Sequence, residues 1–526
     1  MDIAFPPPAA FGLPARFPHW RPDQIEAAQV ILDASTRFVG LTMPTGSGKG
    51  LAYMAALGIG GGRGVVLTST KGLQDQLRDD FGPLVFDVRG QRNYPCKALG
   101  KDGDLADLWH GDGEATCEEG PCHAGVVCGL KEAGCWYYDR LRQATGQRII
   151  STNYAAWLAQ RRYGQGLGGS PDLLVLDEAH DAVDQLAESM TITLEKWLVK
   201  AVGIDSVPDE HGPLQTWKDW AAFQSLRAKS KLETLGKPVS WGDLKYRRRL
   251  RAFLRVMEGL ATMDWHNWVG DHTDQAWVWS VVHPAQYAEQ YLFQGAKKVV
   301  LLSATLTAKT LALLGIEDAT MWECPSRFPI ERRPVIYVPT VKVDFKMTPD
   351  HWTAWKNRVD QIIGPRQDRK GIIHTVSYKR RDAVVAQSQY KDLLVTHQSS
   401  DLVAQVGRFR KNPKPQWLVS PSIMTGWDFP YDQCRCQIIA KLPFPDTRSK
   451  ILKARCEVDA DYMPYLTMQA LVQAVGRGMR APDDWCETFI IDDHWKWFGA
   501  KYRRLAPKWF LEAVRMSLAL PPPLKL

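Results

Sequence analysis

The sequence predicts an α/β protein with two parallel sheets, each covered by helices on both faces. Short apolar runs alternate with helical segments both before about residue 310 and after residue 325, and this alternation is typical of parallel sheets. The length of 526 residues exceeds one compact core and suggests about three or four domains. The hydrophobic content of 45% and the charged content of 24% are those of a globular protein.

Apolar runs bounded by turn residues mark the expected strands. Between residues 90 and 140 the pattern changes to a segment rich in Gly, Asp and Cys, which indicates an insertion, and residues 181 to about 290 have a mostly helical pattern. The expected strands are 38–42, 65–69, 148–154, 173–176, 299–302, 335–338, 371–374, 417–419, 437–440 and 488–491.

Composition restricts the class of protein. No apolar run approaches the length of a membrane span, and the first residues lack the layout of a signal peptide. We therefore expect a soluble, cytoplasmic protein, in a bacterial cell or a virus-infected host cell, with no membrane partner. The net charge of +8 permits a polyanionic partner without demanding one.

A glycine-rich loop lies between the first expected strand and a helical run over 51–57. Glycines at 46 and 48 let backbone amides turn around phosphates, and Lys49 adds the charge that reaches the outer phosphates. An ordinary turn is the alternative. The position after the lysine usually carries Ser or Thr, which binds Mg²⁺, but here it is a glycine. The expected nucleotide-binding residues of the loop are Thr45, Gly46, Ser47, Gly48, Lys49 and Gly50.

Gln24 lies about twenty residues before this loop. Its amide can read the two hydrogen-bonding edges of adenine. The same stretch also fits a helix start, with Pro22 and Asp23 in the first turn, and both interpretations can hold together.

Two carboxylates follow directly after the expected strand 173–176. Asp177 can hold Mg²⁺, and Glu178 can orient and deprotonate an attacking water. Farther along, Ser303-Ala304-Thr305 offers hydroxyls for a relay to the second half of the chain. The run from Gln473 to Arg480 places Arg477 and Arg480 on one helical face, where an arginine can stabilise charge on a transferring phosphoryl group.

Five of the ten cysteines fall between Cys96 and Cys135. In a reducing compartment, such a group indicates a metal site more than a disulfide framework. Thiolates select iron–sulfur clusters or zinc over hard cations, and unligated structural cysteines are the remaining alternative.

Taken in this order along the chain, these motifs resemble those of the superfamily 2 helicases, specifically the iron–sulfur branch typified by XPD and DinG. The shared motifs are the Gln24 region, the glycine-rich loop, Thr68–Leu77, Asp177–His180 (the DEAH box), Ser303–Leu306, Gly371–His374, Ser420–Asp428 and Gln473–Arg480. The marks of the branch are Arg92–Cys96, Cys135 followed by Tyr137 and Tyr138, Asn153-Tyr154, Ser326–Pro329 and Lys441–Phe444. Gly50 and Met43 depart from the family pattern.

The resemblance implies two RecA-like lobes, with an Fe–S insertion and a helical arch-like insertion in the first. The expected segments are 1–90, 141–184 and 291–324 for lobe 1 and its linker, 91–140 for the cluster insertion, 185–290 for the arch, and 325–526 for lobe 2. The cofactors expected are ATP, Mg²⁺ and a [4Fe–4S] cluster held by Cys96, Cys122, Cys128 and Cys135, with Cys117 as the alternative ligand and zinc as the competing metal. The catalytic set is Lys49, Asp177, Glu178, Gln473, Arg477 and Arg480.

The resemblance further implies binding of single-stranded DNA, with RNA as the alternative, and 5′→3′ movement by a monomer. The expected contacts of the strand are Thr68, Lys71 and Asn153 in lobe 1 and Thr375, Thr425 and Trp427 in lobe 2. Each of these also fits a role as a cap or core residue; for Trp427, packing competes closely with stacking on bases.

The function expected is an ATP-dependent helicase. Two other classes compete with it: a nucleic-acid-binding component of a larger complex that uses ATP as a switch, which Gly50 favours, and an ATP-dependent nuclease or remodeller, for which the sequence shows no added nuclease-like motif.

Overall fold

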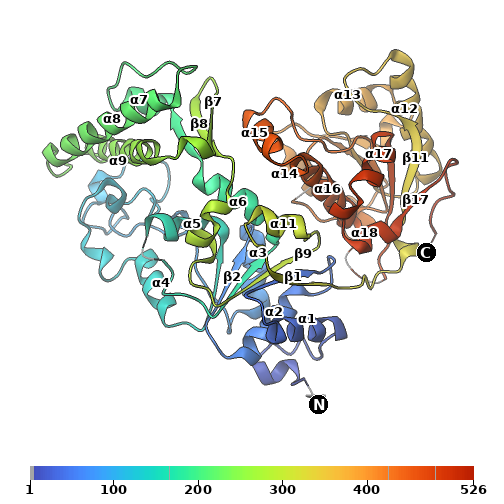
Figure 1. Ribbon diagram of the computed structural model, residues 1–526, viewed down its shortest axis with the longest axis horizontal. Coiled ribbons are helices and arrows are strands. Elements are labelled where there is room, and N and C mark those ends of the chain that lie inside the picture. Colours follow the sequence, from blue (N-terminus) through green and yellow to red (C-terminus); the bar gives the residue numbers. More distant parts are fainter. Residues whose placement is uncertain (1–4, 165, 425, 480, 482, 526) are drawn as a thin grey trace.

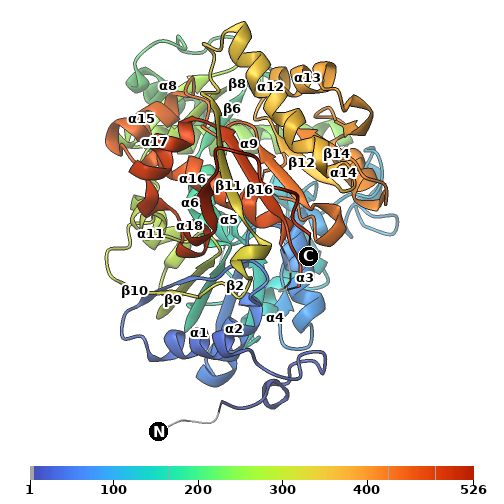
Figure 2. The ribbon, with the colours of Figure 1, turned by 90° about the vertical axis from the view of Figure 1, so that its right-hand side faces the viewer.

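The computed structural model describes residues 5–164, 166–424, 426–479, 481 and 483–525. Its two large sheets confirm the predicted α/β fold, since every strand pair in both sheets is parallel. Figure 1 shows the two lobes side by side, with the blue to yellow-green part of the chain in one and the gold to red part in the other, and Figure 2 views the molecule from the side of the second lobe.

The first sheet has its strands in an order that differs from the order along the chain, as expected for crossover connections. In space the strands are β10 (Ala319–Glu323), β1 (Phe38–Thr42), β9 (Lys298–Ser303), β5 (Leu173–Asp177), β2 (Gly64–Thr68), β4 (Ile149–Asn153) and β3 (Phe86–Asp87). The helices of this lobe are α1 (Pro22–Asp33), α2 (Lys49–Gly60), α3 (Lys71–Phe81), α4 (Trp136–Thr145), α5 (Tyr154–Tyr163), α6 (Ala182–Met190), α10 (Ala285–Tyr287) and α11 (Ala308–Leu313).

Successive side chains of the central strands enter different cores, because neighbouring residues of a strand point to opposite faces. Val65 and Leu67 of β2 join one apolar cluster, whereas Val66 joins the cluster beneath α1 and α2. The same alternation holds for Leu174 and Val175 of β5. Burial on both faces explains why these strands are continuous apolar runs in the sequence.

The second sheet repeats the architecture. Its strands, in spatial order, are β13 (Leu394–Val395), β14 (Trp417–Ser420), β12 (Gly371–His374), β15 (Cys436–Ile439), β16 (Glu487–Asp492), β11 (Val335–Val341) and β17 (Val514–Met516). Its helices are α12 (Pro349–Ile363), α13 (Tyr378–Gln387), α14 (Leu402–Lys411), α15 (Lys450–Val458), α16 (Tyr462–Val475), α17 (His494–Lys501) and α18 (Lys508–Ala513).

The segment 185–290 is more than helical. Besides α7 (Lys196–Ala201), α8 (Leu214–Thr234) and α9 (Trp241–Thr262), it contains an antiparallel sheet of β6 (Ile192–Glu195), β8 (Ala276–Val281) and β7 (Trp268–His272). The buried tryptophans Trp277 and Trp279 alternate with half-buried residues on β8, a period of two that the sequence interpretation missed. The green helices α7, α8 and α9 lie beyond α5 and α6 in Figure 1, and one continuous core joins them to the first sheet.

The Cys-rich segment 91–140 consists mainly of short 3₁₀ turns before α4. It packs against α9: the rings of Trp109 and Trp241 are in edge contact at 4.9 Å, and Leu244 joins the apolar cluster of the segment. The charges of Arg248 and Arg251 reach His123 of the segment and help to lower its pKa, to which burial contributes most. Part of the basic run of α9 therefore faces the Cys-rich segment. Among the described helices, none is both long and apolar enough to cross a membrane.

Candidate active site

The order of the strands brings the polar strand ends of lobe 1 into one row. Thr42 of β1 pairs with Ser303 of β9, and Asp177 of β5 lies on the other side of β9. Next along the row, Thr68 of β2 pairs with Asn153 of β4. The carboxyl ends of parallel strands meet at one edge of a sheet. At this edge, the residues expected to bind nucleotide or to form the relay lie at the ends of β1, β9 and β5, and those expected to bind nucleic acid lie at the ends of β2 and β4.

The glycine-rich loop joins β1 to α2, as the sequence predicts. Gly46 and Gly48 have φ values of 80° and 78°, in the left-handed region that glycine adopts without steric cost. Lys49 is the first residue of α2. The loop therefore has the backbone geometry of a phosphate cradle at a helix N-terminus.

Gln24 braces this loop. Its Nε2 donates to the Ser47 carbonyl at 3.2 Å, and its Oε1 accepts from the Arg21 amide at 2.9 Å. A Cβ at Gly48 would lie only 2.3 Å from Gln24 Nε2, so the close approach requires a glycine. Both polar ends of the amide are engaged here, and adenine reading by Gln24 stays a prediction.

Glu178 is held opposite the loop. Its Oε1 lies 2.7 Å from Lys49 Nζ, and its φ of 51° is a left-handed value that is costly for a residue other than glycine. Burial by itself would raise the pKa of Glu178, but the positive charges of Lys49 and His180 outweigh it and lower the pKa well below its usual range. Glu178 is therefore ionised, and its basicity would rise only when Lys49 moves away from it.

Asp177 is the carboxylate that suits a hard cation. Burial, and then the charge of Glu178, raise its pKa to about 6, so the group lacks a full positive partner. Its Oδ1 accepts from the Glu178 amide at 3.0 Å, and its carbonyl accepts from the Tyr154 hydroxyl at 3.1 Å. An oxygen ligand of this kind fits Mg²⁺ bound to nucleotide phosphates.

Gly50 lacks the hydroxyl that the family carries at this position, but the hydroxyl of Tyr53 lies nearby. The sequence interpretation did not identify Tyr53. A Cβ at Gly50 would lie 3.6 Å from the Tyr53 hydroxyl and 3.3 Å from Phe81 Cε2. Burial raises the pKa of Tyr53 well above its ordinary value, and the charge of Asp177 raises it further. Tyr53 thus brings a neutral hydroxyl close to the position where the family carries Ser or Thr; nothing in a single sequence marks it, because a tyrosine in a helix is usually a core residue.

A chain of polar contacts leads from Glu178 to lobe 2. His180 lies 3.3 Å from Glu178 Oε2, and its Nδ1 lies 2.7 Å from Ser303 Oγ. Ser303 Oγ and Thr305 Oγ1 are 3.2 Å apart. The Thr305 carbonyl accepts from Gln469 Nε2 of α16 at 2.7 Å. These contacts support the expected relay through Ser303 and Thr305, while Gln469 was missed because it lies outside the recognised motif.

The charge on His180 is part of this chain. Burial would lower its pKa, but the carboxylates of Asp181 and Glu178 outweigh burial and raise it to about 9. His180 is therefore an imidazolium at neutral pH, donating to both carboxylate neighbours.

Lobe 2 faces the glycine-rich loop. A Cβ at Gly476 would lie 3.7 Å from Thr45 Oγ1, and Thr45 and Gly476 line one pocket together with Met479 and Trp509. Arg477 Nη1 pairs with Asp428 at 3.1 Å. Burial lowers the pKa of Arg477, and the charges of Glu178 and Asp181 partly offset this, so the guanidinium is within their electrostatic reach.

The other members of the expected lobe 2 set are less defined. Gln473 is half-buried on α16, and Arg480 lies outside the described residues. The buried Nε of Arg477 has no hydrogen-bond partner among the described atoms. This N–H group is a free donor on the side of lobe 2 that faces the glycine-rich loop.

The candidate strand contacts in lobe 1 differ in accessibility. Lys71 is exposed at the start of α3, whereas Thr68 is buried and donates to the Thr70 carbonyl at 3.3 Å. Asn153 caps α5 by accepting from the Ala156 amide at 2.8 Å. Of the three, Lys71 is the one whose side chain is free to reach a phosphate.

In lobe 2, Thr375 is buried and donates to the Ser377 carbonyl at 3.3 Å. Trp427 is half-buried and packs against an apolar cluster that contains Phe409 and Phe429, so packing accounts for at least part of its ring. Thr425 lies outside the described residues.

The five clustered cysteines gather in space, and all are free thiols. A Cβ at Gly120 would lie 3.3 Å from Cys96 Sγ and 3.5 Å from Cys122 Sγ. Cys117 Sγ lies 3.9 Å from Cys135 Sγ, and this contact lowers the pKa of Cys135 to about 6. Cys117, expected to be the spare, is thus next to one of the favoured ligands.

Two family models match the chain. The model described as a helicase C-terminal domain matches residues 366–513, and the model described as the res subunit of type III restriction enzymes matches residues 17–202. The sequence has no match among curated proteins.

Solved structures share the whole architecture. A structure titled XPD helicase is similar over 95% of this chain and 100% of its own, with a TM-score of 0.60 and 16% identity. A structure of Xpd4 from S. tokodaii is similar over 94% and 100%, with a TM-score of 0.60 and 14% identity. Identities this low show the fold alone, and the two family models each describe part of the chain. The chain therefore carries a helicase C-terminal domain over residues 366–513 and has the fold of the XPD structures.

Proposed function

We propose that this chain is a superfamily 2 helicase of the XPD/DinG type. It would use ATP to move 5′→3′ along single-stranded DNA and to unwind duplexes, with a structural [4Fe–4S] cluster in segment 91–140. The observation that carries the motor assignment is the continuous line of contacts from Lys49 through Glu178, His180 and Thr305 to Gln469 of lobe 2. It joins the hydrolytic carboxylate to the lobe that must move.

The hydrolytic step uses side chains already in place. Lys49 leaves Glu178 for the outer phosphates of ATP, because phosphate oxygens offer it more negative charge. Glu178 then accepts a proton from the water that attacks the γ-phosphorus, and the bond to the ADP oxygen breaks. Arg477 moves from Asp428 to the transferring phosphoryl group, whose charge it stabilises. Asp177 would hold Mg²⁺, which supplies further neutralisation of phosphate charge when bound.

Coupling follows from the same contacts. When Lys49 leaves, Glu178 has only His180 as a cationic partner, and His180 is in turn bonded to Ser303. A shift of Ser303 and Thr305 changes the contact with Gln469, so the state of the nucleotide reaches α16. Closure and reopening of the two lobes would then alternate the grip on the strand.

The strand would cross the carboxyl edges of both sheets. Lys71, Thr68 and Asn153 would contact it in lobe 1, and Thr375, Thr425 and Trp427 in lobe 2. A groove of about 590 Å³ between lobe 1 and segment 91–140 adds cations and aromatic rings, among them Arg78, Lys97, Tyr94 and Trp136. Cations with interleaved aromatic rings are what sequence-independent binding of single strands requires.

The thiols fit an iron–sulfur cluster. The close approach of Cys96 Sγ and Cys122 Sγ to Gly120, and the lowered pKa of the Cys135 thiol, suit a soft metal centre. Cys96, Cys122, Cys128 and Cys135 would hold it, with Cys117 as the alternative. When bound, the cluster supplies cross-links for a segment that otherwise has little regular structure.

The domain boundaries proposed are 1–90, 141–184 and 291–324 for lobe 1, 91–140 for the cluster insertion, 185–290 for the arch and 325–526 for lobe 2. The described residues of the candidate active site all come from one chain, which supports a monomer. We also propose a cytoplasmic location.

Unwinding of forked, 5′-tailed and 3′-tailed duplexes of DNA and RNA tests the proposal. We expect ATP-dependent unwinding of forked and 5′-tailed DNA, and iron with acid-labile sulfide in the purified protein. Unwinding from 3′ tails alone would reverse the polarity, and colourless protein containing zinc would overturn the cluster.

A second function, an ATP-dependent switch in a larger complex, is favoured by Gly50. Its signature would be slow, strand-stimulated ATP hydrolysis without unwinding of any of these substrates.

A further inference from the structure

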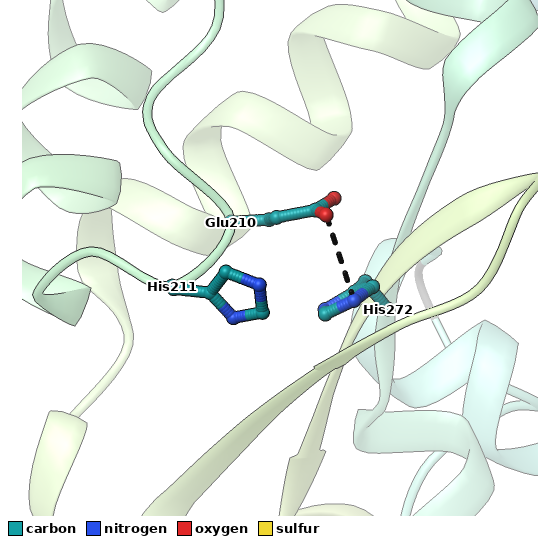
Figure 3. A group of neighbouring side chains, drawn as sticks. All are labelled: Glu210, His211 and His272. Atoms are coloured by element: carbon teal, nitrogen blue, oxygen red, sulfur yellow. Dashed lines mark ion pairs between the residues drawn. The ribbon is translucent and has the colours of Figure 1, made fainter.

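A group of metal-ligating side chains lies in the arch segment, apart from the nucleotide edge and from the clustered cysteines. Glu210 and His211 come from the loop between α7 and α8, and His272 ends β7. One ligand atom from each residue lies within 4.8 Å of those of the other two. Figure 3 shows the three side chains pointing toward one another from two separate segments.

The geometry within the group suits a shared ion. His272 Nε2 lies 3.6 Å from Glu210 Oε1. The two imidazole rings are 5.1 Å apart and nearly perpendicular, at 75°. One ring nitrogen of each histidine is therefore within reach of a single ion.

Packing beneath the group fixes both segments. The His211 amide donates to Asp209 Oδ1 at 3.0 Å, and the Asp209 carbonyl accepts from Trp217 Nε1 at 3.2 Å. Trp217 is buried, and its ring contacts Trp279 of β8 at 5.0 Å. The loop and the β7–β8 hairpin are therefore anchored to the same aromatic core, so the ligands need little rearrangement.

The second oxygen of Glu210 has its own partner. Lys196 Nζ lies 3.7 Å from Glu210 Oε2 and 5.0 Å from the Trp277 ring centroid. Oε1 is left for a metal while Lys196 orients the carboxylate, as outer partners commonly do for metal ligands.

We propose that Glu210, His211 and His272 bind one Zn²⁺ ion, with water completing a tetrahedral site. Two imidazoles and a carboxylate are a recurrent zinc ligand set, and each imidazole binds through a ring nitrogen. The ion links the loop 203–213 to the β7–β8 hairpin. Asp271, beside His272, lies 3.3 Å from Lys450 of lobe 2, so this link lies next to a contact between the arch and the second lobe.

Zinc titration of the full chain by calorimetry, after dialysis against a weak chelator, tests the site. Because the clustered cysteines can also bind zinc, the readout is the difference between variants. His211→Ala and His272→Ala should each weaken one class of Zn²⁺ site at least tenfold, and Glu210→Gln should weaken the same class. The matched control is His266→Ala, since His266 is exposed in the same segment and outside the group; its isotherm should equal that of the unmodified chain.

Hydrogen exchange gives a readout that locates the ion. Zn²⁺ should slow the exchange of amides in 203–213 in the unmodified chain and in the His266→Ala variant, but not in the His211→Ala variant. His211 is exposed and its ring has no hydrogen bond among the described contacts, so this variant should keep its fold. Equal isotherms for all variants, or equal protection of 203–213 in the His211→Ala variant, would overturn the proposal.

Discussion

The two lobes share a local device at the ends of equivalent strands. In lobe 1, Thr68 ends β2 and donates to the carbonyl of Thr70, which caps α3. In lobe 2, Thr375 follows β12 and donates at the same distance, 3.3 Å, to the carbonyl of Ser377, which caps α13. Both lobes therefore turn a strand into a helix in the same way.

The strand ends of the two lobes carry different groups. Lobe 1 gathers Lys49, Asp177, Glu178 and His180 at one place. In lobe 2 the buried His374 ends β12 beside Ser420, and Asp492 ends β16, paired with His494. Since the sheets are alike, the fold alone does not make a nucleotide site. In the proposed mechanism, lobe 1 carries the hydrolytic groups and lobe 2 contributes Arg477.

Removing the lysine of lobe 1 should have the largest effect. Lys49→Ala deletes the cation that neutralises the outer phosphates, so strand-stimulated ATP hydrolysis should fall more than about 1,000-fold. Steady-state phosphate release measures it. Binding of single-stranded DNA without nucleotide is the control and should persist. Hydrolysis at the wild-type rate would contradict the assignment of Lys49 to the nucleotide site.

Removing the arginine of lobe 2 should come next. Arg477→Ala should lower turnover by about 100-fold because the transferring phosphoryl group loses its cation, while nucleotide affinity changes less. Comparing kcat with KM for ATP separates these effects. A change in KM alone would mean that Arg477 binds nucleotide without stabilising the transition state.

The uncharged histidine of lobe 2 predicts a pH dependence of stability. Burial lowers the pKa of His374 to about 4, against about 6.5 in an unfolded chain. Between these values only the unfolded chain takes up the proton, so the free energy of unfolding should fall as the pH drops from 6.5 to 4, by about 3 kcal/mol. Urea unfolding of the wild type and His374→Gln measures the difference, and parallel curves for the two would contradict it.

Cutting the contact between the lobes should have a moderate effect. Gln469→Ala removes the donor to the Thr305 carbonyl, so stimulation of ATP hydrolysis by single-stranded DNA should fall about tenfold, a loss in the range found for a hydrogen bond in a coupled network. Lys309→Ala breaks a different contact between the lobes, the pair with Asp459, and serves as the matched variant. Equal losses of stimulation in the Gln469→Ala and Lys309→Ala variants would mean that any weakened contact between the lobes has this effect, and would contradict a specific relay through Gln469.

Restoring the family hydroxyl should have the smallest effect. Gly50→Ser should raise turnover a few-fold or lower the Mg²⁺ concentration at half-maximal rate, since Phe81 needs to shift only slightly to admit the side chain. Tyr53→Phe should slow the wild type more than the Gly50→Ser variant. Identical responses in both backgrounds would show that the Tyr53 hydroxyl does not serve in place of the missing one.

Prediction from sequence succeeded best for central strands. The expected strand 371–374 coincides with β12, and 38–42 with β1, because strands buried on both faces must be apolar throughout. The edge strands β3, β10, β13 and β17 were missed. Three of them have only two or three residues and carry no readable period, and none of the five residues of β10 is buried. The sheet β6–β8–β7 was missed because the period of two at Trp277 and Trp279 lies in a stretch that was assigned as mostly helical.

What the sequence by itself determined is the inventory of chemistry: a lysine after a glycine turn, two carboxylates after an apolar run, and a group of thiols. Local spacing suffices for these, because each depends on one strand end or one turn. Tertiary structure alone decided which groups meet. The strand order set β9 between β1 and β5, which put Ser303 beside His180, and the packing of the lobes brought Gln469 to Thr305 and Gly476 to Thr45. Contacts between residues more than a hundred positions apart follow from how the elements pack, and no local pattern encodes them.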